Sequence, residues 1–120
     1  MIDISKKSQC RAAGEFVFLS GRAGLHDDKR VVTGGIAAQT RVALDHLEDT
    51  LRERGLDRSH IIKANVFLSG KELFPEFNRV YSEFFAGHEL PARRTIVAEL
   101  VMNDCLVEID AVACSNSAME

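Results

Sequence analysis

Two strand-like segments near the C-terminus constrain the fold of this chain more than any other feature. Residues 90–100 and residues 105–113 are both rich in Ile, Val and Leu, and only residues 101–104 separate them. A connection this short favours antiparallel pairing of the two strands that it joins. The sequence therefore predicts that these segments form a hairpin.

The predicted register gathers polar side chains on one face of this hairpin. With the turn centred on residues 102–103, Val97 lies opposite Glu108, Thr95 opposite Asp110 and Arg93 opposite Val112. Because side chains alternate along a strand, one face is expected to carry Arg93, Thr95, Glu108 and Asp110. The other face is expected to be apolar and comprises Ile96, Ala98, Leu100, Val107, Ile109 and Ala111.

Two interpretations of the polar face stay open at this point. Charges on the open face of an antiparallel sheet are common, and cross-strand ion pairs there contribute roughly 0–1 kcal/mol each. Alternatively, the charged groups bind a ligand, because a desolvated charge without a partner costs several kcal/mol. The alternation alone does not separate a solvated surface from a binding site.

Length, charge and cysteine content narrow the class of protein. The 120 residues predict a single domain, residues 1–120, and the net charge of −3 argues against a nucleic-acid-binding protein. No apolar run approaches the ~20 residues of a membrane span, and the N-terminal residues lack a signal peptide, so we expect a cytoplasmic protein. The three cysteines suggest no disulfide framework, and the four histidines show no ligand spacing, so no metal site is expected.

Hydrophobic periodicity predicts the other elements of the fold. Apolar residues recur at helical or alternating spacing in two helices, at residues 36–54 and 75–85, and in strands at residues 9–12, 16–20 and 61–69. The resulting order, β-β-(β)-α-β-α-β-β with an optional short edge strand at residues 30–33, indicates an α+β fold with a mixed sheet and both helices on one face. Since two helices cover only one face, we expect the apolar part of the other face to meet further subunits of a homo-oligomer.

Five short motifs occur in a fixed order along the chain. They are Ser20-Gly21 after an apolar strand, Ala38-Gln39 early in the first helix, Asn78-x-x-Tyr81-x-x-Phe84-Phe85, Pro91-Ala92-Arg93, and Glu108-Ile109-Asp110-Ala111. Each motif is unspecific by itself, but the set at these spacings resembles the RidA/YjgF family of enamine/imine deaminases, formerly labelled endoribonuclease L-PSP or translation inhibitor. The resemblance extends from about Gly14 to Ala113.

This resemblance implies a fold, an assembly and an activity. It implies a chorismate-mutase-like α+β fold and a homotrimer with ligand clefts between subunits. The implied activity is hydrolysis of 2-aminoacrylate, or its tautomer 2-iminopropanoate, to a 2-keto acid and ammonia, without a cofactor. The residue that matches the family's carboxylate-binding arginine is Arg93, and Glu108 matches the glutamate that positions or activates water. Gly21 matches a glycine that lines the substrate pocket, and Asn78 matches an asparagine of the conserved family set. Thr95 lies two residues beyond Arg93 on the same predicted strand face, so we expect it to contact the substrate side chain.

The chain departs from the family pattern at several positions. Lys7 falls near the family's N-terminal tyrosine, Arg22 replaces the usual glutamine after Ser-Gly, and Thr95 stands where many members have cysteine. Val101 also follows Leu100 where a proline is usual. These departures bear on which substrate is bound more than on which reaction is catalysed. A pathway-specific deaminase of a larger enamine therefore remains an alternative.

Two other classes of function are alternatives to a deaminase. A non-catalytic trimer would bind 2-keto acids through Arg93. A ribonuclease would require an RNA-binding surface, which the acidic balance, the single tyrosine and the absence of tryptophan make unfavourable.

Overall fold

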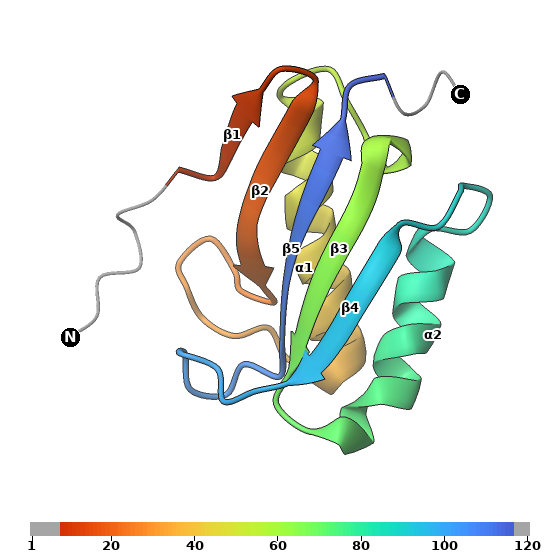
Figure 1. Cartoon of the computed structure of the whole chain (residues 1–120). Coiled ribbons are helices and arrows are strands. Elements are labelled where there is room, and N and C mark those ends of the chain that lie inside the picture. The colour runs from red at the N-terminus through yellow and green to blue at the C-terminus, as the bar shows by residue number, and fades with distance from the viewer. Residues whose placement is uncertain (1–7, 117–120) are drawn as a thin grey trace.

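The computed structural model describes residues 8–116 of the chain (Figure 1). Two α-helices and two short 3-10 turns accompany the strands: α1 (Gly35–Arg52), α2 (Phe74–Phe84), η1 (Arg58–His60) and η2 (Lys71–Leu73). The strands are β1 (Cys10–Ala13), β2 (Phe16–Ala23), β3 (Ile61–Leu68), β4 (Ala92–Val97) and β5 (Val107–Cys114). The element order therefore confirms the other predicted helices and strands. The optional edge strand at residues 30–33 does not form, and these residues contribute only the isolated bridge of Val31 to Leu25.

The five strands form one mixed sheet in the order β1-β2-β5-β3-β4. The pairs β1–β2, β2–β5 and β3–β5 are antiparallel, whereas β3 and β4 are parallel. Helix α2 makes the crossover between β3 and β4, as a parallel connection requires. In Figure 1 both helices lie behind the sheet, so the α+β architecture with two helices on one face is confirmed.

The predicted hairpin between the last two strands is wrong, because β3 lies between β4 and β5. Glu108 pairs with Phe67 of β3 and not with Val97, which pairs with Leu68. The hairpin was predicted from the short connecting loop alone. In the structure β5 is a central strand, which lies between β2 and β3 and buries every second residue. β4 has no buried residue, and it occupies the edge of the sheet. The intervening loop instead passes across the end of β3.

The predicted polar face is also wrong, for the same reason. Arg93 pairs with buried Ala64, and Thr95 pairs with buried Val66, so both project toward the helices. Glu108 and Asp110 alternate with the buried residues of β5 and project from the opposite, open face. Arg94 and Ile96 are the β4 residues on that open face, since they pair with Asn65 and Phe67.

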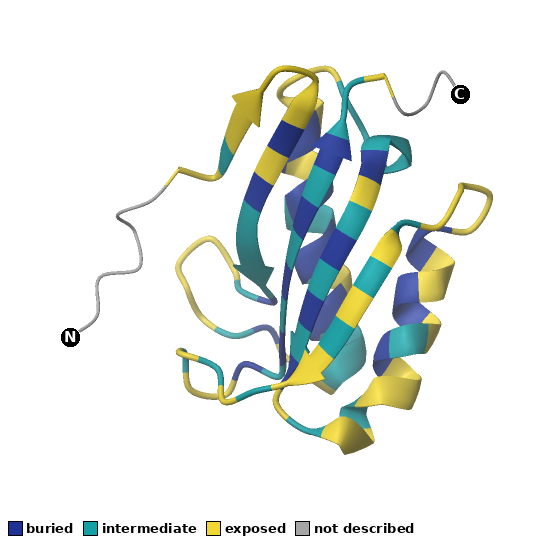
Figure 2. Ribbon diagram, viewed as in Figure 1, coloured by how far each residue is buried: buried dark blue, intermediate teal, exposed yellow. Residues whose placement is uncertain are grey.

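The hydrophobic core fills the space between the helices and the sheet. Figure 2 shows buried and less buried residues alternating along β3 and β5. The buried residues of these strands form one cluster with the buried residues of both helices. The buried residues of α1 recur at helical spacing, and they include Thr40, Ala43, Leu44, Leu47 and Leu51. Those of α2 are Phe77, Val80, Tyr81 and Phe84. The two predicted apolar helix faces are thus confirmed.

One buried ion pair ties the two helices together. The Glu48 side chain on α1 is only 7% exposed and accepts hydrogen bonds from the Arg58 guanidinium at 2.6 and 2.9 Å. Arg58 also donates to the Phe84 carbonyl at 2.7 Å and lies 3.9 Å above the Phe84 ring. These contacts hold the pKa of Glu48 below its usual value, chiefly through the hydrogen bonds from Arg58.

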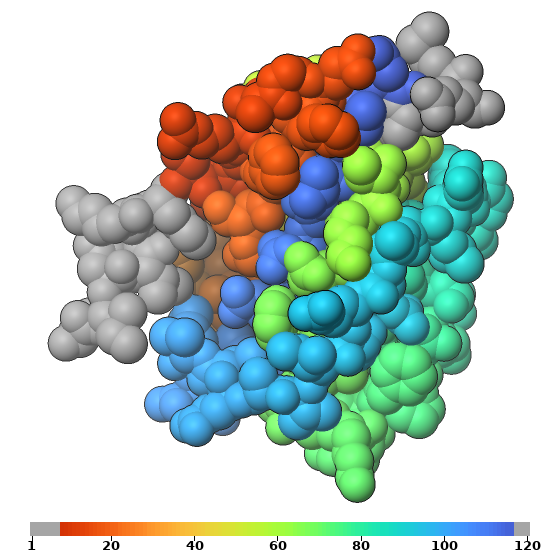
Figure 3. Space-filling model, in the orientation of Figure 1, coloured from red at the N-terminus to blue at the C-terminus, as the bar shows by residue number. Residues whose placement is uncertain are grey.

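The open face of the sheet is partly apolar. Phe16, Phe18 and Ile96 are 44%, 49% and 43% exposed there. The space-filling view of Figure 3 looks onto this face, where side chains of β2, β5, β3 and β4 lie at the surface with no helix over them. This surface is consistent with the expected oligomer, which stays a prediction. Within residues 8–116 no helix is long and apolar enough to cross a membrane.

Candidate functional site

Arg93 is held between the sheet edge and helix α2. Its Nη1 donates a hydrogen bond of 2.8 Å to the Asn78 side-chain oxygen. Its guanidinium carbon lies 4.7 Å from the centroid of the Tyr81 ring and 5.6 Å from those of Phe74 and Phe77. No carboxylate of residues 8–116 forms an ion pair with Arg93. The guanidinium is therefore oriented and retains free donors for an anionic ligand.

Two hydroxyl groups accompany this arginine without a hydrogen-bond partner in the described part of the chain. They are the buried oxygens of Thr95 and Tyr81. Thr95 lies two residues beyond Arg93 on the same side of β4. Burial raises the pKa of Tyr81 to about 12, against a smaller opposing effect of Arg93, so the phenol is neutral at physiological pH. We refer to Asn78, Arg93 and Thr95 as the arginine half-site.

Glu108 lies on the open face, directly against Gly21. A β-bulge between Leu19 and Arg22 distorts β2 at this point. A Cβ atom built on Gly21 would overlap the Glu108 carboxylate, so a larger residue there would displace the carboxylate. The glycine is therefore explained by the close approach of Glu108 and not by a left-handed backbone. We refer to Gly21 and Glu108 as the glutamate half-site.

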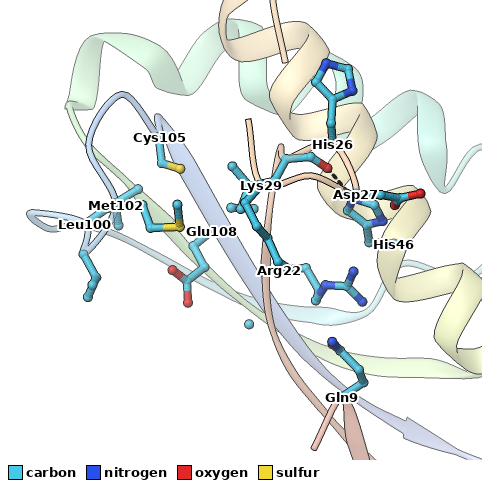
Figure 4. Close-up of a pocket in the computed structure, with 14 residues that line it drawn as sticks. Gln9, Arg22, His26, Asp27, Lys29, His46, Leu100, Met102, Cys105 and Glu108 are labelled. Carbon is cyan, nitrogen blue, oxygen red and sulfur yellow. Dashed lines mark hydrogen bonds between the residues drawn. The ribbon is translucent and has the colours of Figure 1, made fainter. Parts of the chain in front are cut away.

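A cavity of about 320 Å³ opens beside the glutamate half-site (Figure 4). One wall comes from the end of β2 and the loop that follows it, the other from the loop between β4 and β5. Besides Gly21 and Glu108, the cavity is lined by Gln9, Arg22, Ala23, Leu25, His26, Asp27, Lys29, His46, Leu100, Val101, Met102 and Cys105. Burial, with lesser contributions of Glu108 and Asp104, raises the pKa of the Cys105 thiol, which disfavours a nucleophilic thiolate.

Gln39 on α1 fixes both walls of this cavity. Its amide nitrogen donates to the Asp104 carbonyl at 3.2 Å, and its amide oxygen accepts from the Leu106 N–H at 2.8 Å. Asp104 has a positive φ of 67°, a conformation that is uncommon for a residue other than glycine. On the other wall, a Cβ on Gly24 would overlap the Gln39 backbone. From the sequence, Gln39 was noted only as part of a family motif, although its helical spacing also places this polar residue in the buried stripe of α1.

The predicted site residues thus fall into two groups. Asn78, Arg93 and Thr95 lie on the helix side of the sheet, and Gly21 with Glu108 lies on the open side. Lys7, expected near the substrate, lies outside the described residues. Among residues 8–116 no three His, Cys, Asp or Glu side chains gather into a group that could hold a metal ion.

Comparison with known proteins identifies the family. The sequence profile described as endoribonuclease L-PSP matches residues 4–115. A RutC family protein of Pyrococcus horikoshii is 35% identical over 112 residues, which cover 92% of this chain and 87% of that protein. The chain belongs to the YjgF/Rid family. The resemblance inferred from the five motifs is thereby confirmed.

Solved structures of YjgF/Rid proteins share this fold. The YjgF gene product of E. coli superposes with a TM-score of 0.86 at 27% identity, over 93% of this chain and 90% of that chain. E. coli TdcF with bound serine superposes with a TM-score of 0.85 at 27% identity, with the same coverage of both chains. The YjgF-like α+β fold predicted from the sequence is confirmed.

Proposed function

We propose that this YjgF/Rid protein is an enamine/imine deaminase, a hydrolase acting on C=N bonds. Its substrates are 2-aminoacrylate or 2-iminopropanoate-type intermediates, and its products are a 2-keto acid and ammonia. The observation that carries this proposal is the Arg93 guanidinium, which is oriented by Asn78 and has no carboxylate partner in the described chain. An arginine fork binds a carboxylate bidentately, which suits a small planar imino acid.

The complete site is proposed to form between subunits of a homotrimer. Because the two half-sites project from opposite faces of one sheet, a substrate on Arg93 cannot also contact Glu108 through the body of the same subunit. Assembly of several chains, each covering a neighbour's apolar open face, would bring the arginine half-site of one chain to the glutamate half-site of the next. Exposed Phe18 and Ile96 on the open face favour such an assembly.

In the proposed mechanism the two half-sites have separate tasks. Arg93 binds the substrate carboxylate and thereby fixes the imine carbon. Glu108 of the neighbouring chain accepts a hydrogen bond from a water molecule, whose oxygen attacks that carbon while Glu108 takes its proton. The imine nitrogen takes a proton from solvent as the C–O bond forms, which gives a carbinolamine. Glu108 then returns its proton to the amine nitrogen, the C–N bond breaks and ammonia leaves, and the hydroxyl group loses its proton to water as the keto group forms. Imines hydrolyse in water unaided, so positioning and electrostatics suffice for useful catalysis.

The direct test generates the imine in place. An amino acid oxidase converts an L-amino acid to its imine in the presence of the purified protein, and ammonia or keto acid is followed with time. We expect the protein to accelerate release of both products above the rate of spontaneous hydrolysis. A rate equal to that of the protein-free control would exclude the deaminase.

One observation supports a second candidate function, that of a non-catalytic trimer that binds 2-keto acids or amino acids. TdcF, a structural neighbour, was solved with bound serine. Such a protein would bind these ligands through Arg93 without accelerating imine hydrolysis, so the same assay separates the two functions.

A further inference from the structure

Gln39 on α1 holds the loop between β4 and β5, residues 98–106, but is not among the residues that line the cavity. Its side chain is buried, and the residue is 3% exposed. The amide nitrogen donates to the Asp104 carbonyl, and the amide oxygen accepts from the Leu106 N–H, so each end of the amide meets a complementary backbone group. An apolar side chain at this position would lose both bonds and leave both backbone groups without these partners.

The middle of this loop has little else to fix it. Both ends of the loop are hydrogen-bonded to the end of β3, at Leu68 and Ser69. Between those ends, within residues 8–116, one hydrogen bond ties the loop to another element, the bond from Gln39 to the Asp104 carbonyl. Asp104 also has the positive φ of 67°, which turns the chain back toward β5. The position of the middle of the loop therefore depends on Gln39 and on this turn.

The loop forms a mostly apolar wall of the cavity next to Glu108. The loop residues that line the cavity are Leu100, Val101, Met102 and Cys105. Figure 4 shows Leu100, Met102 and Cys105 on the same side of the cavity as Glu108. Burial is the main cause of the raised pKa of the Cys105 thiol, and the nearby Glu108 carboxylate adds to it. A ligand that reacts at Glu108 would therefore lie against a wall that Gln39 holds.

We propose that Gln39 is a positioning residue, which holds the loop as a wall against the substrate side chain and thereby sets the affinity for imines with apolar side chains. This inference rests on the proposed function for the location of the reacting carbon near Glu108. Glu108 does not depend on the loop for its own place, because its backbone pairs with Ala23 of β2 and Phe67 of β3. Loss of the Gln39 bonds should therefore raise KM and change kcat little.

Binding of a stable 2-keto acid tests the inference without catalysis. Isothermal titration calorimetry measures the affinity of the assembled protein for 4-methyl-2-oxopentanoate, the keto acid of leucine. Gln39→Met keeps the length of the side chain but makes neither bond, and the affinity should fall about tenfold, the equivalent of one to two net hydrogen bonds. Thr40→Val is the matched control, since Thr40 is the next residue of α1, is fully buried and has a hydroxyl without a hydrogen-bond partner among the described residues. This variant should bind like the wild type.

A second pair of variants disturbs the same contact from the loop. Proline fixes φ at about −65°. It therefore cannot adopt the φ of 67° at Asp104, so Asp104→Pro should move the turn and reproduce the loss seen with Gln39→Met. Asp104→Gly removes the same carboxylate but permits a positive φ and keeps the carbonyl that accepts from Gln39, so it should bind like the wild type. Asp104 is exposed, so neither change alters the core, and this pair decides if Gln39→Met does not fold.

A purely structural role of Gln39 predicts a different result. In that case Gln39→Met would unfold at a lower temperature than the wild type, but the folded variant would keep the wild-type affinity and KM. That result, or wild-type affinity in Asp104→Pro, would overturn the inference. A fall in kcat at constant KM would overturn it as well, because the effect would then lie in the reaction and not in binding.

The assay with the imine of leucine separates failure of this inference from failure of the proposed function. A higher KM in Gln39→Met with nearly unchanged kcat supports both. Acceleration by the wild type with an unchanged KM in Gln39→Met contradicts the inference and supports the function. No acceleration by the wild type, with keto-acid affinity that falls in Gln39→Met and Asp104→Pro but not in the controls, contradicts the deaminase and supports Gln39 as a positioning residue. A wild-type protein that neither accelerates hydrolysis nor binds the keto acid contradicts both.

Discussion

Arg93 and Glu108 project from opposite faces of the same sheet. Arg93 pairs with Ala64, whose side chain is buried under the helices, whereas Glu108 pairs with Phe67 on the open face. Strand β3 separates the strands that carry them. If both residues act on one substrate molecule, that molecule must bind between two copies of the chain.

Complementation between inactive variants tests this consequence. Arg93→Ala and Glu108→Gln should each be inactive alone, but a refolded equal mixture should recover activity. A site is intact when one chain supplies Arg93 and the next supplies Glu108, which random mixing satisfies in about a quarter of sites. Light scattering should report about three times the chain mass of 13.3 kDa. A mixture without recovered activity, or a stable monomer at micromolar concentration, would contradict the shared site.

Arg93→Ala should abolish substrate binding while the fold remains intact. The loss of a desolvated charge partner costs about 2–5 kcal/mol, or roughly 30- to several-thousand-fold in affinity or rate. Arg93→Lys should also be poor, since an ammonium lacks the planar fork. The neighbouring Arg94 projects from the other face, so Arg94→Ala serves as the control in steady-state kinetics. Equal losses in both alanine variants would refute the assignment of Arg93 as the carboxylate-binding residue.

Glu108→Gln should reduce turnover more than binding. The amide keeps the shape of the side chain beside Gly21 but cannot accept a proton, so kcat should fall by about 10²–10⁴ if Glu108 acts as a base. The affinity for a 2-keto acid, measured by calorimetry, should change much less. A variant with the wild-type kcat would reduce Glu108 to a structural role.

Thr95→Cys should change which imines the protein prefers. The Thr95 hydroxyl is buried on the Arg93 side of β4 and has no hydrogen-bond partner among the described residues, and we predict that a substrate side chain supplies this partner. A thiol is a much weaker hydrogen-bonding group, and the variant should shift preference toward 2-iminopropanoate. The measurement compares imines of alanine, leucine, methionine and glutamate with both proteins. Identical profiles would place Thr95 outside the site.

Individual helices and strands could be predicted because each follows from the spacing of apolar residues within one short segment. Both helices follow from apolar residues at helical spacing, and the alternation within β5 correctly separates Glu108 from Ile109. Which strands lie side by side was not predictable from this pattern. The short loop after β4 suggested a hairpin, but it can equally cross the end of β3, where Ala98 donates to the Leu68 carbonyl and Leu106 accepts from Ser69.

The candidate site shows the same limit. The family motifs contain every residue of the two half-sites except Thr95, which was singled out by its predicted strand face. Contacts explain the motif residues, such as the hydrogen bond between Arg93 and Asn78 and the close approach of Glu108 to Gly21. Their division between two faces depends on strand order, which is a property of the whole sheet. The helical spacing marks Gln39 as part of the buried stripe of α1, but its partners lie in the loop between β4 and β5 and at Gly24, so the local pattern did not show what it binds.

Glu48→Gln should destabilise the fold and flatten its response to acid. The buried Glu48 carboxylate accepts hydrogen bonds from Arg58, and removal of its charge should cost about 1.5–3 kcal/mol at pH 7. Because its pKa is lower in the folded than in the unfolded state, the stabilisation is present above the unfolded pKa of about 4.3 and is lost as pH falls through the folded value. Urea unfolding at a fixed protein concentration should therefore show a gap between the wild type and the variant that narrows below about pH 4.

The exposed pair of Glu76 and Arg79 provides the control for this measurement. Both side chains are about half exposed, and surface ion pairs contribute little, so Glu76→Gln should leave the unfolding midpoint nearly unchanged. The two variants each remove one carboxylate charge, from α1 or from α2. The Glu48–Arg58 pair is buried and its arginine also donates to the Phe84 carbonyl, whereas the Glu76–Arg79 pair is exposed. If Glu48→Gln and Glu76→Gln unfolded at the same urea concentration, the Glu48–Arg58 pair would not be what joins α1 to α2.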